Sequence, residues 1–73
     1  MKIVEYTNSS NIDKTSYDED KQIMYVKFKS GGNYSYEGVP ADVYKNMNNS
    51  ESVGRYFHNF IKNKFPYKKI SSF

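Results

Sequence analysis

The stretch QIMYVKFKSGGNYSYE, residues 22–37, predicts a β-hairpin at the centre of the fold. Apolar and polar side chains alternate through residues 22–29, which is the period of a strand with one buried face. The apolar members of this alternation are Met24, Val26 and Phe28. Ser30-Gly31-Gly32 predicts the connection, because glycine adopts the positive φ angles that hairpin loops require. Residues 33–37 return as the neighbouring strand.

Two further strands are predicted on the N-terminal side of the hairpin. Residues 12–17 form the first, and the polar run Asp18-Glu19-Asp20-Lys21 separates it from the hairpin as a turn. Residues 1–6 place Ile3 and Val4 between polar neighbours, which indicates a short edge strand. The expected sheet is an antiparallel meander of three strands, with a fourth strand at its N-terminal edge.

Two helices are predicted after the strands. Pro40 suits the first turn of a helix, and apolar residues recur at helical spacing until Asn48-Asn49 interrupts them. The second helix carries an apolar stripe at 100° per residue, so we expect it to pack on the sheet. Ser50 or Ser52 can cap its start, and Pro66 ends it by disfavouring helical geometry at the preceding residue. The stripe consists of Val53, Tyr56, Phe57, Phe60, Ile61 and Lys64.

The chain is therefore expected to be one α+β domain, with both helices packed on one face of the sheet. Its 73 residues suffice for one domain, with a core at about residues 8–67 and loosely ordered ends. There is no cysteine for a disulfide or a zinc cluster. The 8 Tyr and 5 Phe can stabilise the core instead, because each buried ring removes roughly 150–250 Å² from water. Self-association into a homo-oligomer would help further.

The hairpin register decides which face of the sheet Tyr34 and Tyr36 occupy. A two-residue Gly31-Gly32 loop pairs Lys29 with Tyr34 and Lys27 with Tyr36. The two tyrosines then share a face with lysines, as in the stacking platforms that bind single-stranded nucleic acid.

The alternative register is a three-residue Ser30-Gly31-Gly32 loop. It sets the two tyrosines beside Phe28 and Val26 on the core face, and it sends Glu37 to solvent. The two-residue loop would instead turn the Glu37 carboxylate toward the core, where an unpaired charge is costly. Energetics therefore favour the three-residue loop, and a tyrosine near a sheet edge can still keep its hydroxyl at a binding rim.

Positive charge is concentrated toward the C-terminus. Residues 1–40 hold 5 basic and 6 acidic side chains, a balance of −1, whereas residues 41–73 hold 6 basic and 2 acidic, a balance of +4. This asymmetry suggests an anionic partner, although basic tails also keep proteins soluble. No apolar run approaches the roughly 20 residues of a membrane span, and the N-terminus lacks the apolar stretch of a signal peptide. We expect a cytoplasmic protein that does not enter membranes.

The polar side of the second helix carries candidate anion-binding residues. Arg55, His58, Asn59 and Lys62 lie opposite the apolar stripe, where they could follow a phosphate backbone. An ordinary solvated helix face would give the same pattern.

The start of this helix, Ser52-Val53-Gly54-Arg55, combines a hydroxyl, an unobstructed backbone and a guanidinium. Helix N-termini attract anions through unpaired amides and the positive end of the helix dipole. The simpler interpretation is that Ser52 caps the helix and Gly54 lets it lie close against a strand.

Catalysis is not expected. His58 is the only histidine, it lies among cations, and no cysteine or Ser–His–carboxylate set accompanies it. The acidic residues 18–20 lack the length, the glycine and the distal glutamate of a calcium loop. The sequence therefore predicts a non-enzymatic protein with no metal site and no cofactor.

A series of short motifs runs along the chain between about residues 8 and 67. The motifs are Ser9-Ser10-Asn11-Ile12, Tyr17-Asp18, Val26-x-Phe28, Gly32-x-Tyr34-x-Tyr36, Val39-Pro40, Ser52-x-Gly54-x-Tyr56-Phe57 and Ile61-Lys62. In this order they resemble the KTSC domain, whose centre carries a Tyr-x-Tyr pattern. That domain occurs at the C-terminus of some lysyl-tRNA synthetases and as a stand-alone small protein in bacteria and phages.

The resemblance implies a binding module that assists contact with tRNA or other RNA. Two positions depart from the family pattern, because His58 stands where asparagine is expected and Ser50 where alanine is expected. If residue 58 touches a ligand, the imidazole changes what is bound. A stand-alone chain also lacks the synthetase that would supply tRNA specificity.

The sequence thus predicts a function with two alternatives. The chain is expected to bind nucleic acid, RNA rather than DNA, with cations on phosphate and tyrosines on base or ribose. One alternative is a phage or prophage module that docks on a host protein through exposed aromatics, and the other is capture of a small anionic nucleotide at the start of the second helix. The candidate binding residues are Ser52, Gly54, Arg55, His58, Lys62, Lys27, Lys29, Tyr34 and Tyr36.

Overall fold

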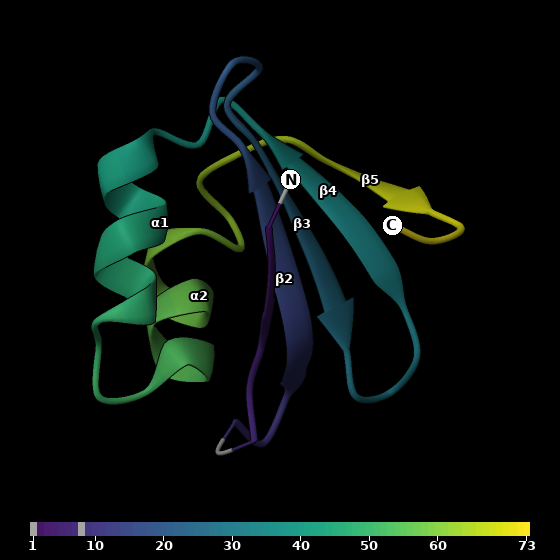
Figure 1. Ribbon diagram of the computed structural model, residues 1–73, viewed down its shortest axis with the longest axis vertical. Coiled ribbons are helices and arrows are strands. Elements are labelled where there is room, and N and C mark those ends of the chain that lie inside the picture. The colour runs from purple at the N-terminus through teal and green to yellow at the C-terminus, as the bar shows by residue number, and fades with distance from the viewer. Residues whose placement is uncertain (1, 8) are drawn as a thin grey trace.

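Five antiparallel strands form a single sheet, and both helices lie on one of its faces, as Figure 1 shows. The computed structural model describes residues 2–7 and 9–73. Met1, expected in the N-terminal strand, and Asn8, expected at the start of the family-like stretch, lie outside the described residues. The elements are β1 (Ile3–Glu5), β2 (Ile12–Asp18), β3 (Ile23–Phe28), β4 (Asn33–Glu37), α1 (Ala41–Asn48), α2 (Val53–Phe60) and β5 (Tyr67–Ile70).

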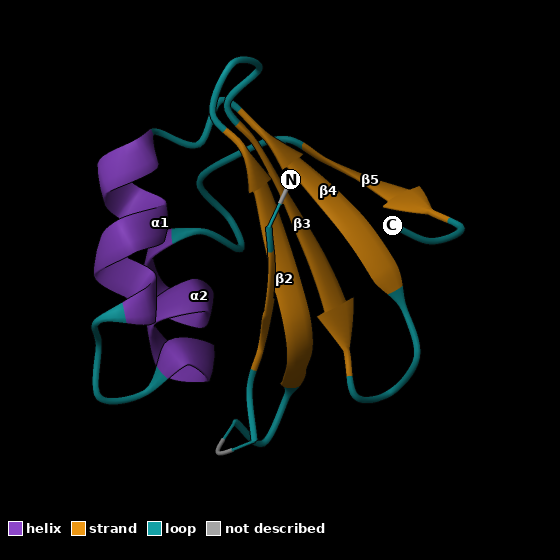
Figure 2. Cartoon of the chain, viewed as in Figure 1, coloured by secondary structure: helices purple, strands orange, loops and turns teal. Residues whose placement is uncertain are grey.

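The predicted α+β class and meander are confirmed. β2, β3 and β4 pair in sequence, and β1 pairs with β2 as the expected edge strand. The turn after β2 also forms where expected, because the Asp18 carboxylate accepts hydrogen bonds from the backbone N–H groups of Asp20 and Lys21. α1 begins at Ala41, one residue after Pro40. Figure 2 shows the helical layer beside the curved sheet.

Strand β5 is an addition that the sequence did not predict. It pairs with β4, so that Tyr67 lies opposite Tyr36 and Lys69 lies opposite Tyr34. The run Tyr67–Ile70 shows no alternation of apolar and polar side chains. Its strand conformation therefore depends on the unpaired edge of β4, which supplies hydrogen-bond partners that no local pattern reveals.

The hairpin between β3 and β4 places Tyr34 and Tyr36 on the face that the helices cover. Val26 lies opposite Tyr34, and Met24 lies opposite Tyr36. This confirms the core-facing interpretation, although the register differs by two residues from the one expected for a Ser30-Gly31-Gly32 loop.

The difference in register arises in the turn itself. The Gly31 N–H donates to the Phe28 carbonyl at 2.9 Å, and the Phe28 N–H donates to the Gly32 carbonyl at 2.9 Å. The loop is therefore Lys29-Ser30-Gly31, one residue earlier than expected. Gly31 takes φ 108°, which suits the third position of a three-residue hairpin loop and favours glycine there.

The core lies between the sheet and the two helices. Its largest contributor from α2 is Phe57, which is 4% exposed, whereas Phe60 on the same helix is 53% exposed. The remaining buried apolar residues come from the sheet, the connection to α1, α1 itself and the end of α2. They are Ile12, Met24, Val26, Tyr36, Val39, Met47 and Ile61.

The second helix is shorter than predicted, because it ends at Phe60 and does not continue toward Pro66. Ile61 leaves helical geometry with φ −121° and ψ −47°. The Lys62 N–H then donates to the Phe57 carbonyl at 2.9 Å, which closes a turn. This turn redirects the chain toward β5, so the apolar stripe ends before Lys64. Within the described ranges, neither helix has the length and apolar character needed to cross a membrane.

A network of hydroxyl groups ties the N-terminal segment to α1. The buried Thr15 hydroxyl lies 2.9 Å from the Tyr6 hydroxyl and 2.9 Å from the Tyr44 hydroxyl. The Tyr6 hydroxyl also donates to the Asn48 side-chain carbonyl. Burial raises the pKa of Tyr6 to about 12, because the charged phenolate is poorly solvated there.

Candidate functional site

Two adjoining hollows open where the N-terminal segment, α2 and the β3–β4 hairpin meet. The first, of about 620 Å³, is lined by residues 5–7, 9–11, 50–55 and 58, and we call it the helix-start hollow. The second, of about 520 Å³, is lined by the hairpin, α2, the turn after α2 and β5, and we call it the aromatic groove. Ser10, Asn11 and His58 line both hollows, so the two share one wall.

The helix-start hollow is shaped by the first turn of α2. The Arg55 N–H donates to the Ser52 side-chain oxygen at 3.3 Å, so Ser52, and not Ser50, is the cap of the two that were predicted. A Cβ at Gly54 would stand 3.5 Å from the Ser9 side-chain oxygen, which is ordinary contact. Gly54 therefore faces the N-terminal segment, and the expectation that it packs against a strand is wrong. Ser9 is held there because its hydroxyl oxygen accepts the Ile12 N–H at 3.0 Å.

Loss of this cap gives a direct test of how α2 starts. Replacing Ser52 with alanine should lower the free energy of unfolding by about 1 kcal/mol, because the Arg55 N–H loses its partner at the helix end. Urea denaturation would measure the loss. Ser52→Asn is the matched control, since asparagine also caps helices and should keep most of the stability. Equal losses in both variants would contradict a capping role.

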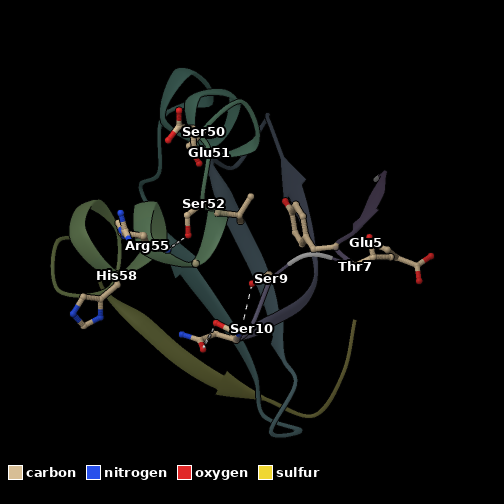
Figure 3. A pocket seen from close by; sticks show the side chains of 13 residues that line it. Glu5, Thr7, Ser9, Ser10, Ser50, Glu51, Ser52, Arg55 and His58 are labelled. Carbon is tan, nitrogen blue, oxygen red and sulfur yellow. Dashed lines mark hydrogen bonds between the residues drawn. The ribbon is translucent and has the colours of Figure 1, made fainter.

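The charges of the helix-start hollow are mixed. Figure 3 shows Arg55 and His58 on one side and Glu5 on the other, with Glu51 near the loop that leads into α2. With His58 neutral, one arginine and two glutamates give a formal balance of −1. The carboxylates offset the attraction that the helix start and Arg55 exert on an anion. This hollow is therefore poorly suited to a phosphate on its own.

Aromatic rings form the floor and one wall of the aromatic groove. The Phe57 ring meets the rings of Phe28 and Tyr36 edge to face, at centroid distances of 5.4 and 5.2 Å. The Tyr67 ring lies 6.0 Å from that of Tyr34. Tyr36 and Phe57 are each 4% exposed, whereas Tyr67 is 60% exposed. The buried rings thus support an accessible one.

The rim of the aromatic groove is cationic. Its charged or titratable side chains other than tyrosine are Lys29, His58 and Lys62, and none of its described lining residues is Asp or Glu. The amides of Asn11 and Asn63 add neutral donors and acceptors. Burial raises the pKa of Tyr36 to about 12, so its phenol stays neutral at physiological pH. The groove therefore offers ring surface and positive charge together.

The KTSC domain family model matches residues 8–65. The chain belongs to the KTSC domain family. A lysine–tRNA ligase from Trichormus variabilis is 40% identical over 62 residues, which is 85% of this chain and 11% of the ligase. An uncharacterised protein from Stutzerimonas stutzeri is 39% identical over 54 residues, which covers 74% of this chain and 76% of that protein. The chain thus spans about a tenth of the ligase's length.

A solved structure shows the same fold. The crystal structure of a KTSC domain protein from Yersinia pestis has a TM-score of 0.85 and 34% sequence identity, covering 94% of this chain and 99% of the other. The family expected from the motif series, and the relation to part of a lysyl-tRNA synthetase, are both confirmed.

The KTSC fold brings most of the predicted site residues to one surface. Ser52, Gly54 and Arg55 line the helix-start hollow, and His58 belongs to both hollows. Four more predicted residues line the aromatic groove, namely Lys29, Lys62, Tyr34 and Tyr36.

Lys27 does not join this surface. It lies opposite Lys14 on one side and Asn33 on the other, on the face of the sheet away from the helices. Side chains alternate along a strand, so Lys27 points away from Val26 and Tyr34. The prediction of a stacking platform that combines Lys27 with the two tyrosines is therefore wrong.

Several groove residues were not selected from the sequence. Tyr67 and Asn63 follow α2, where no strand was predicted, so nothing indicated that they return to the hairpin. Ser10 and Asn11 appear in the KTSC motif series without a role, and the order of that series was the one available signal. Among residues 2–7 and 9–73, no cluster of three or more His, Cys, Asp or Glu side chains could hold a metal ion.

Proposed function

We propose that this KTSC domain is a non-enzymatic cytoplasmic module that binds single-stranded nucleic acid, RNA in preference to DNA. The proposed interface is the aromatic groove together with the exposed Arg55 on α2. The observation that carries the proposal is the make-up of the groove, where an exposed ring stands beside lysines and no carboxylate is present among the described lining residues.

This composition matches what a nucleic acid strand presents. Its phosphates require cations, and its bases require flat apolar surfaces, on which stacking contributes roughly 1–3 kcal/mol per base. Arg55 on α2 and Lys62 in the turn that follows α2 are both exposed, and the exposed Lys29 lines the groove from the hairpin loop. A relative named as a lysine–tRNA ligase adds support for RNA as the partner.

Removing two cations from this surface tests the proposal. The variant Arg55→Ala/Lys62→Ala should bind labelled single-stranded RNA on the order of tenfold more weakly, and its salt dependence should be shallower by roughly 1.4 in log–log slope. Fluorescence anisotropy titrations between roughly 50 and 200 mM salt would measure both quantities. The physical reason is that each phosphate contact releases condensed counterions from the RNA. A variant that makes fewer of these contacts releases fewer ions when it binds.

A second double variant separates position from net charge. Lys21→Ala/Lys45→Ala removes the same charge from two exposed positions outside both hollows. It should bind nearly as the unmodified chain does. Equal weakening by both double variants would show general attraction without a defined surface, and no binding at low salt would overturn the proposal.

A protein partner is the second candidate. It is favoured by Phe60, which is 53% exposed and packs against Tyr56 at a ring distance of 4.6 Å, outside the aromatic groove. Exposed aromatic anchors are typical of protein interfaces, and binding through them depends only weakly on salt. Binding that persists in high salt and is lost in Phe60→Ala would favour this candidate.

A further inference from the structure

We infer that the aromatic groove is a site for one unpaired nucleobase, which stacks on Tyr67 while Lys29 and Lys62 hold the adjoining phosphates. This inference rests on the proposed function and specifies its ligand. It also assigns the main contact to a residue outside the Tyr-x-Tyr motif.

Tyr67 is the ring that a ligand can reach. It is 60% exposed, whereas Tyr36, its partner on the neighbouring strand, is 4% exposed, with the two ring centroids 5.8 Å apart. Tyr34 meets the Tyr67 ring from the side at 6.0 Å. The backbone of Tyr67 is fixed as well, because β5 pairs Tyr67 with Tyr36 across the sheet. While β5 is paired with β4, the backbone of Tyr67 is therefore already positioned, so stacking on the closed strand costs little additional backbone entropy.

The groove has the size and edge chemistry for a base. A volume of about 520 Å³ falls among pockets that hold small organic ligands. Asn11 and Asn63 stand on its lining and each offers an amide donor and an acceptor, which are the groups that pair with base edges. An aliphatic ligand could not form hydrogen bonds with these amides, whereas the edge of a base could.

The charge of the rim selects an anionic ligand. Lys29 reaches the groove from the hairpin loop and Lys62 from the turn after α2, so two separate segments supply cations for the phosphates of a bound strand. The helix-start hollow differs, because Glu5 and Glu51 oppose Arg55 there. The stacking site therefore lies at the groove and not at the helix start.

The proposed contacts require an unpaired base. In a duplex, both faces of each base are covered by its neighbours, and its pairing edge is occupied. Only a base turned out of the strand can lay its face on Tyr67 and its edge toward Asn11 or Asn63. The groove should therefore discriminate against duplex RNA.

The test uses a short single-stranded RNA that carries one 2-aminopurine, whose fluorescence falls when it stacks. Binding to the unmodified chain and to Tyr67→Phe should quench the probe. Tyr67→Ala should bind about 5- to 150-fold more weakly and leave the probe bright, since stacking on one ring is lost. Phe60→Ala is the matched control, because it removes another exposed ring outside the groove and should behave as the unmodified chain does.

The outcomes separate this inference from the proposed function. If the RNA binds in a salt-dependent way but the unmodified chain leaves the probe bright, base stacking is overturned and phosphate binding stands. Equal affinity for the matching duplex would overturn it as well. Binding that is absent even at low salt would overturn the proposed function, and the inference with it. Circular dichroism checks that each variant is folded.

Discussion

Replacing Phe57 with alanine should lower the free energy of unfolding by about 3–5 kcal/mol. The ring is 4% exposed and fills the space between α2 and the sheet, against Phe28 and Tyr36. Its loss combines the transfer energy of a large apolar side chain with a cavity that the surrounding strands cannot close. A domain of 73 residues has little stability to spare, so much of the variant should be unfolded at room temperature.

Phe60 provides a control on the same helix. It is 53% exposed and packs mainly against Tyr56, so Phe60→Ala should cost about 0.5–1.5 kcal/mol. Urea denaturation followed by circular dichroism would compare the two variants with the unmodified chain. Similar losses at both positions would show that α2 does not face the sheet through Phe57.

Stability should fall steeply in alkaline solution, between about pH 10 and about pH 12. Burial raises the pKa of both Tyr6 and Tyr36 from 10.0 to about 12 in the folded chain. The unfolded chain therefore loses these protons first, so the stabilisation is fully present below pH 10 and is lost as the pH rises through 12. At about 1.4 kcal/mol per pH unit, each tyrosine contributes at most roughly 3 kcal/mol, and solvent around the partly accessible phenols reduces this contribution.

Phenylalanine substitutions separate the two contributions. Among the described residues, the Tyr36 hydroxyl has no hydrogen-bond partner, so Tyr36→Phe should leave stability near neutral pH almost unchanged. Tyr6→Phe breaks the contacts to Thr15 and Asn48 and should lower stability at every pH. In both variants the free energy of unfolding should fall less steeply as the pH rises. Urea denaturation at several alkaline pH values would measure this slope. Burial also raises the pKa of Tyr17, so some pH dependence remains. An unchanged slope in both variants would contradict the assignment.

The elements predicted correctly are those whose pattern is local. Alternation of Met24, Val26 and Phe28 was enough to predict β3 and its buried face, and helical spacing placed Phe57 toward the sheet. The hairpin register was not predicted correctly, because two adjacent glycines could each supply the positive φ angle. Gly31 takes it, and this choice depends on how β3 pairs over its whole length.

The candidate site was predictable where its residues lie on the β3–β4 hairpin or on the second helical segment. Helical periodicity grouped Arg55, His58 and Lys62, although α2 ends at Phe60 and Lys62 lies in the turn that follows. Tyr67 could not be placed, because it reaches the groove only when β5 pairs with β4, and its local sequence does not favour a strand. The proposed stacking site on Tyr67 therefore depends on pairing between strands that are far apart in the sequence.

The position of β5 links recognition to local stability. Edge strands with a single neighbour and exposed side chains open more readily than the core does, without unfolding of the whole chain. β5 pairs only with β4 within the described sheet, and three of its four residues are exposed. When β5 opens, Tyr67 leaves the groove while the helices and the remaining strands stay folded. A ligand stacked on Tyr67 would hold this edge closed, so the affinity of the groove includes the free energy of closing one strand.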